Sequence, residues 1–173
     1  MVKTWFDELG AYAKRPSGAG LSQLTHDPSG AAHPDWSPDG RLLAYDTAGT
    51  YLDVANADGS GNTPVEPGFL EGNACSGGGS DPSFAPNGKH LAFVSADGTT
   101  IYTVSLHGGT KHRVVHDALP KASPVYSPDG KKIAYSTGGP NPGIWVVRAK
   151  GHHRKPKRIA SSTGYVTWQP LPR

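Results

Sequence analysis

The sequence predicts an all-β fold, a β-propeller built from four-stranded antiparallel blades. A motif recurs along the chain every 42 to 48 residues, and Gly and Pro lie at regular places between short apolar runs. The 173 residues include 23 Gly and 16 Pro, and 35% are hydrophobic. Gly and Pro in such positions indicate many tight turns, which is typical of all-β domains. No segment shows the 3.6-residue period of helical repeats.

The recurring motif predicts a hairpin in each repeat. It reads Pro34–Gly40, then Pro82–Gly88, then Pro124–Gly130, and a degraded copy begins at Val166. In each copy an aromatic strand leads into a Pro-Asp/Asn-Gly turn, and an apolar strand such as Leu42–Tyr45 follows. Pro presets the first turn position, Asp or Asn caps the turn, and Gly accepts the left-handed residue. Two further strands complete each unit, so the repeat predicts a propeller blade.

The same residues resemble a known family. The pattern Trp/Phe/Tyr-Ser-Pro-Asp-Gly-Lys/Arg-x-Leu/Ile-Ala-Tyr/Phe is similar to the WD-like propeller repeat of TolB and its relatives, over about residues 11–170. The resemblance implies a propeller fold and, because TolB-like proteins act in bacterial envelopes, a bacterial setting. It implies no chemistry, because the motif residues build the blade.

The repeat divides the chain into four blade equivalents. Three are complete, at about residues 33–66, 81–116 and 123–160. The fourth is expected to be split: residues 165–173 supply its first strand and residues 1–27 supply the other three. A blade closed from both termini is the usual way for a propeller to close its ring and protect its sheet edges.

Three architectures agree with this count. The chain is a monomeric four-bladed ring, or a homodimer in which each copy completes the split blade of the other, or a piece of a larger propeller. The last class includes a natural fragment and an engineered ring that assembles by oligomerisation.

Propellers bind ligands at the channel mouth, where the innermost strands begin. The residues expected at the mouth are polar, and each blade equivalent contributes one or two of them. They are His33, Asp35, Asp81, Ser83, Ser123, Tyr165 and Thr167. A mixed polar ring of this kind suits a peptide, a small polar ligand or a cation, and its structural alternative is strand capping and hydrogen bonding to water.

Other candidate sites are weaker. The chain has eight His, but no spacing typical of a zinc site occurs, and residues 56–62 lack the terminal Glu of a calcium loop. The basic run 150–158 has no interleaved aromatic residues, so we predict a solvated hairpin and no nucleic-acid partner. The insertion 72–80, which contains the single Cys75, is expected to lie over the channel mouth.

No catalytic or cofactor motif occurs, and the net charge is only +3. We therefore expect a non-enzymatic scaffold, without cofactor, that binds a protein or peptide at the channel mouth. The alternative is a module that binds a small molecule or a metal, such as a lectin or an enzyme. No run has the length of a membrane span. Met1–Glu8 lacks the apolar stretch of a signal peptide, so the chain as written is expected in the cytoplasm, or in the bacterial envelope if the setting of the resembled family holds.

Overall fold

The predicted all-β fold is confirmed. The structure, a computed structural model, describes residues 3–7, 10–14, 22–25, 30–47, 51–65, 79–107, 110–150 and 155–168. These residues form fifteen strands and no helix. None of the described residues belongs to a helix of the length and apolarity that crossing a membrane requires.

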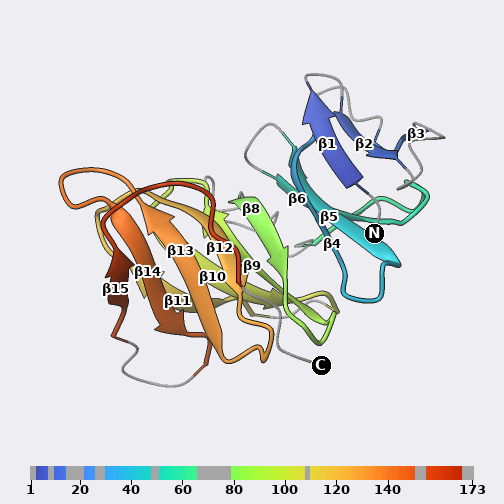
Figure 1. Cartoon of the computed structure of the whole chain (residues 1–173). Coiled ribbons are helices and arrows are strands. Elements are labelled where there is room, and N and C mark those ends of the chain that lie inside the picture. Colours follow the sequence, from blue (N-terminus) through green and yellow to red (C-terminus); the bar gives the residue numbers. More distant parts are fainter. Residues whose placement is uncertain are drawn as a thin grey trace, which may run out of the picture.

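The strands form one three-stranded and three four-stranded antiparallel sheets, shown in Figure 1. The first sheet contains β1 (Lys3–Asp7), β2 (Gly10–Lys14) and β3 (Ser22–Gln23). The second contains β4 (Ala32–Trp36), β5 (Leu42–Thr47), β6 (Tyr51–Asn56) and β7 (Thr63–Pro64). The third contains β8 (Gly79–Phe84), β9 (His90–Ser95), β10 (Thr100–Ser105) and β11 (His112–His116). The fourth contains β12 (Lys121–Tyr126), β13 (Lys132–Thr137), β14 (Gly143–Arg148) and β15 (Lys157–Ala160).

The sheets follow one another in chain order as the blades of a propeller. Their first strands lie innermost, since β8 contacts both β4 and β12. The predicted hairpin turns form as expected: Ser37 donates its hydroxyl to Asp39 Oδ1 at 2.6 Å, and the Gly40 N–H donates to the Ser37 carbonyl. Gly40 has a φ of 70°, the left-handed conformation that glycine adopts at no steric cost.

The hydrophobic core lies between consecutive sheets and is therefore divided into three clusters. One cluster joins Val94 and Ile101 of the third sheet to Ile133 and Tyr135 of the fourth. A second joins the second and third sheets, and a third joins the first and second. Each four-stranded sheet thus depends on its neighbours for burial, as in other repeat proteins.

The N-terminal part of the predicted split blade forms three strands, β1 to β3 in that order. The expected first strand is not formed by residues 165–168, which have no strand conformation and no ladder with β1. Trp168 instead donates its indole N–H to the Val125 carbonyl of β12 at 3.0 Å. The C-terminal segment thus lies against the preceding inner strand, as β12 lies against β8. Residues 169–173 lie outside the described residues, and closure of the ring stays a prediction.

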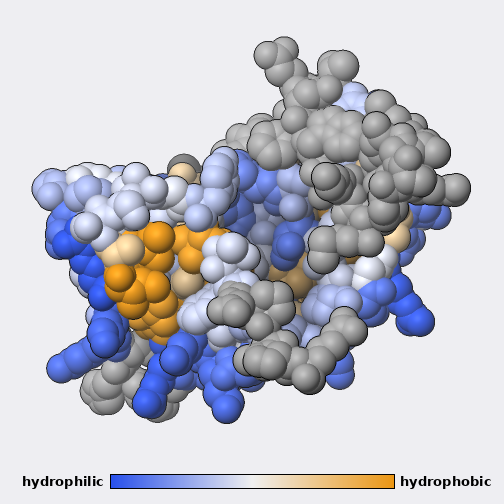
Figure 2. All heavy atoms as spheres, in the orientation of Figure 1, coloured by the Kyte–Doolittle hydropathy of each residue, from blue (hydrophilic) through white to orange (hydrophobic). Residues whose placement is uncertain are grey.

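The sheet β12–β15 has an apolar surface that no described sheet covers. Figure 2 shows an apolar patch on this face, in the orientation of Figure 1. Val146 is half-buried there and Ile159 is 58% exposed. Side chains with this pattern are typical of the surface that one blade presents to the next.

Candidate functional site

Each of the three complete blades has the same backbone irregularity at the start of its innermost strand. His33, Asp81 and Ser123 have φ values of 49°, 54° and 50°. The ladder between the first and second strands shifts register at each of these points. A left-handed backbone is uncommon for residues other than glycine and costs free energy. The left-handed conformation recurs at equivalent positions, so at this end of each inner strand the side chains depart from the regular alternation of a β-strand.

Proline explains the shift in register. Each left-handed residue precedes a proline, namely Pro34, Pro82 or Pro124. Proline has no N–H to donate to a ladder, so within a sheet it is found at bulges and edges. The resulting bulge takes two residues of the inner strand out of the ladder and leaves their side chains at the channel mouth.

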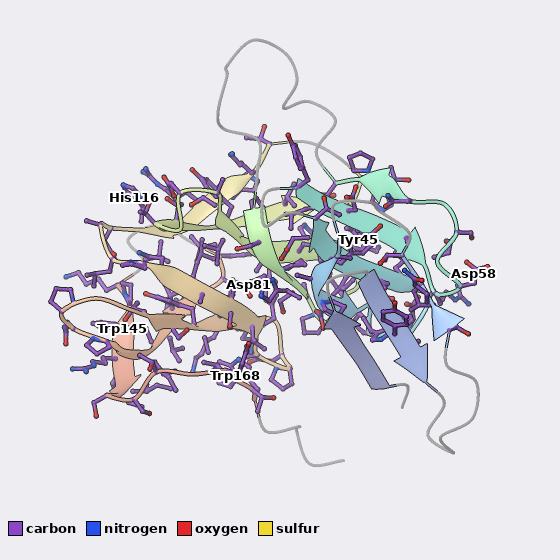
Figure 3. The ribbon with its side chains drawn as sticks, turned by 90° about the horizontal axis from the view of Figure 1, so that it is seen from above. Tyr45, Asp58, Asp81, His116, Trp145 and Trp168 are labelled. Atoms are coloured by element: carbon purple, nitrogen blue, oxygen red, sulfur yellow. The ribbon has the colours of Figure 1, made fainter. Side chains whose placement is uncertain are left out.

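These side chains converge on one cavity of about 450 Å3, which we call the mouth pocket. Its lining comes from the beginnings of β4, β8 and β12 and from the C-terminal segment. The lining residues are His33, Pro34, Asp35, Asp81, Pro82, Ser83, Ser123, Pro124, Val125, Tyr165 and Val166. Figure 3 shows Asp81 near the middle of the molecule, whereas Asp58 and His116 lie at the periphery.

A histidine and two carboxylates form the polar centre of the mouth pocket. His33 Nδ1 lies 2.8 Å from Asp46 Oδ2, and His33 Nε2 lies 3.6 Å from Asp81 Oδ1. The hydrogen bond with Asp46 raises the pKa of His33, burial opposes it, and the negative charges of Asp46 and Asp81 add to the rise. The side chains of His33 and Asp81 are 35% and 15% exposed, so a ligand can reach both.

Asp46 bonds to both other members of this polar centre. Its side chain is fully buried, and its Oδ2 also accepts the Asp81 N–H at 2.9 Å. Among the described residues, nothing donates to Asp46 Oδ1. A buried carboxylate in this place holds the left-handed turn at Asp81 and orients His33 at the same time.

Asp35 is the second carboxylate of the pocket wall, beside Asp81, and it joins two blades. Its Oδ2 accepts the Phe84 N–H of β8 at 2.6 Å. Burial raises the pKa of Asp35 to about 6, although the backbone N–H groups of Phe84 and Trp36 oppose the rise. Asp35 therefore changes charge close to neutral pH.

The structure brings together six of the seven residues that the sequence predicts at the mouth. Thr167 is the exception, since it is exposed and does not line the pocket. Ser83 lines the pocket but is only 7% exposed, and Tyr165 is 88% exposed at the rim. Sequence reasoning missed Asp46. Its signal was an Asp in β5 where the next repeat has Val94, because a carboxylate in an apolar strand needs a partner.

The other candidates do not join this pocket. No three His, Cys, Asp or Glu side chains within the described ranges are arranged to hold a metal ion. His116 Nδ1 lies 2.8 Å from the Thr100 hydroxyl, whereas His26 lies outside the described residues. Most of the insertion that contains Cys75, and residues 151–154 of the basic run, also lie outside them.

Comparison with solved structures finds β-propellers. The chain is similar to TolB from Acinetobacter baumannii, with 21% identity, a TM-score of 0.66, and coverage of 86% of this chain and 36% of that one. A chain of the nidogen/laminin complex matches with 11% identity and a TM-score of 0.71, covering 88% and 59% of the two chains. An oligogalacturonate lyase in complex with manganese matches with 16% identity and a TM-score of 0.65, covering 84% and 45%.

No protein-family model and no curated protein sequence matches the chain. At these identities the structural likeness shows the fold alone, a β-propeller. The chain spans less than two thirds of the length of each of these solved chains. The proteins that share the fold include enzymes as well as binding proteins, so the fold does not decide between the two classes.

Proposed function

We propose that the chain is a non-enzymatic binding module whose mouth pocket takes a positively charged group of a peptide or protein. The observation that carries this proposal is the number of carboxylates at the pocket compared with a single histidine. Asp35 and Asp81 line the pocket, and the buried Asp46 is bonded to His33. A pocket of this charge favours an ammonium or guanidinium group, and such groups occur at peptide N-termini and on Lys and Arg.

The shape of the pocket supports a peptide. The three prolines give it a rigid apolar wall, and Tyr165 adds an exposed aromatic ring at the rim. Exposed aromatic residues and preformed concave surfaces are features of protein-binding sites. A peptide side chain or terminus can therefore enter the pocket while the flanking residues lie along the rim.

Selection from a library of random peptides tests the proposal. We expect the wild-type chain to enrich peptides with a basic residue or a free N-terminus. Their affinity should fall about ten-fold with Asp81→Asn, which removes a charge contact and keeps the shape. Asp58→Asn is the matched control, because it removes one exposed carboxylate charge at the periphery of the molecule. Failure to enrich any peptide sensitive to Asp81→Asn would overturn the proposal.

The pH dependence of that binding gives a second readout. Asp35 becomes neutral below about pH 6, and His33, whose pKa is raised, becomes cationic as the pH falls. Both changes make the pocket less negative. The other titratable groups are Asp81 and Tyr165, which line the pocket, and the buried Asp46, which is bonded to His33. We expect weaker binding of a basic peptide at about pH 5 than at about pH 7.5. Tighter binding at the lower pH would contradict a cationic ligand.

A small polar molecule is the second candidate, and the size of the pocket favours it. About 450 Å3 falls within the range of small-molecule sites. The propeller enzymes among the similar structures, an oligogalacturonate lyase and a putative 6-phosphogluconolactonase, keep a catalytic role open. Metal analysis of the purified chain separates the candidates: a stoichiometric ion that His33→Ala abolishes favours the second, and an ion-free chain that binds a peptide favours the first.

A further inference from the structure

A second cavity, of about 820 Å3, lies at the opposite ends of the inner strands from the mouth pocket. It is formed by the turns that follow β8 and β12 together with the end of β14, and we call it the turn-face groove. An extended strand of six residues is about 20 Å long, so the two cavities are separate sites. Figure 2 shows hydrophilic side chains along the lower edge of the molecule, where these turns lie.

Four cations line the turn-face groove: Lys131, Lys132, Arg148 and Lys150. All four are exposed, and they come from two elements of one blade, the β12–β13 turn with the start of β13 and the end of β14. The mouth pocket is lined instead by carboxylates and one histidine. The two ends of the inner strands therefore carry side chains of opposite charge.

The propeller fold does not require these cations, as the other repeats show. Lys132 and Arg148 lie directly opposite each other in the β13–β14 ladder. In the β5–β6 ladder the equivalent pair is Leu42 and Asn56. Two like charges directly opposite each other on antiparallel strands are destabilising, whereas an uncharged pair is not. The pair of Lys132 and Arg148 therefore lowers the stability of the fold, which indicates that these charges serve a function such as binding.

Little negative charge offsets the cations. Asp129 accepts the Ser127 hydroxyl and the Lys131 N–H through Oδ1, and its Oδ2 lies 3.9 Å from Lys131 Nζ. Within the described part of the chain, the side chains of Lys132, Arg148 and Lys150 form no ion pair. Burial lowers the pKa of His90 in the same groove, and the positive charge of Lys150 lowers it further.

The groove also has an apolar floor, formed by Pro86, Tyr126 and Pro128. Of the described lining residues Tyr126 is the one Phe, Tyr or Trp, and it is half-buried, as is the imidazole-bearing His90. Single-stranded nucleic acids bind through successive exposed aromatic rings that stack on bases. A floor of prolines with one half-buried ring offers no such row, but it suits an aliphatic side chain of a peptide.

We propose that the turn-face groove binds an acidic peptide segment of a partner protein. Its carboxylates pair with the four cations, and an aliphatic side chain packs on the apolar floor. Charge complementarity and the floor carry the proposal together, since cations alone accept any polyanion. The site is independent of the mouth pocket, and its test does not involve any mouth residue.

The test measures affinity by fluorescence anisotropy with three labelled probes. They are an oligoglutamate with two central leucines, an oligoglutamate of the same length without leucine, and an oligothymidylate of the same length. The groove variant is Lys132→Leu with Arg148→Asn, which places the residues of the β5–β6 ladder in β13–β14. The control variant, Arg41→Gln with Lys157→Gln, loses two exposed cations elsewhere. Thermal unfolding of each variant is measured alongside.

We expect the leucine-containing peptide to bind tightest of the three probes, and its dissociation constant to rise at least ten-fold in the groove variant. The control variant should bind with the wild-type affinity, and the groove variant should unfold at the wild-type temperature or above it. Equal losses in the two variants would show general charge attraction and overturn the proposal. Tighter binding of the oligothymidylate, or no effect of the leucines, would also overturn it.

Discussion

Asp35 illustrates how one buried carboxylate links the pocket to stability. Burial raises its pKa from 3.8 to about 6, so the folded chain retains this proton at pH values where the unfolded chain has released it. Stability contributed by this group is therefore highest below about pH 4 and falls as the pH rises to about 6. Above that pH the buried negative charge of Asp35 lowers the free energy of unfolding by its full amount.

We expect Asp35→Asn to stabilise the chain by about 1 kcal/mol at pH 7 and to change little at pH 4. The asparagine oxygen still accepts the Phe84 N–H, but no buried charge remains. Urea unfolding of wild type and variant at the two pH values measures the difference. An equal change at both values would mean that Asp35 acts through its hydrogen bond and not through its charge.

At the residue scale, six of the seven residues that the sequence predicts at the mouth line the mouth pocket, but the sequence did not predict the backbone conformation that places them there. The residue before a proline normally adopts an extended backbone, so nothing in the sequence predicts a left-handed His33, Asp81 or Ser123. That conformation depends on tertiary contacts such as the bond from the Asp81 N–H to Asp46, which joins residues far apart in the chain.

The connection between β11 and β12 shows a similar limit at the scale of elements. Lys121 begins β12 with a fully buried side chain, and its Nζ donates to Asp117 Oδ1 at 2.6 Å and to the Leu119 carbonyl at 2.8 Å. Lysine is rarely buried, so the sequence alone predicts an exposed side chain for Lys121. The hairpin turns were predictable because Pro-Asp-Gly determines the local backbone geometry. The contacts of Lys121 with Asp117 and Leu119, which we call the Lys121 clamp, form only when the connection folds back onto the start of β12.

We expect Asp117→Ala to lower the free energy of unfolding by about 2 kcal/mol, because it leaves a buried ammonium group without its carboxylate. Asp117 is 47% exposed, so the cost stays below that of a fully buried pair. Lys121→Met should restore much of the loss when the two substitutions are combined. Chemical unfolding of the single and double variants gives the coupling, and purely additive effects would refute the clamp.

The whole molecule is a series of interfaces between consecutive sheets, and the described core clusters differ in the size of their side chains. The cluster between the first and second sheets contains Ala11, Ala31 and Ala55 beside its larger side chains. The cluster between the second and third sheets contains Phe84 and Phe93 with several aliphatic residues. On these described side chains less apolar area is buried where alanine stands in place of a larger residue, so we expect the first interface to contribute less free energy. In a chain of stacked repeats, a weak terminal interface opens before the rest.

A matched pair of substitutions tests this order. Leu24 and Leu91, 5% and 0% exposed, lie in the first and second of these clusters. We expect Leu91→Ala to lower the free energy of global unfolding by about 3 kcal/mol. Leu24→Ala should instead speed hydrogen exchange in β1–β3 while the amides of β9 and β13 keep their wild-type protection. If β1–β3 exchanges as slowly as β9 in the wild type, the first sheet is held by a further contact, as ring closure through the C-terminal segment or a second copy would provide.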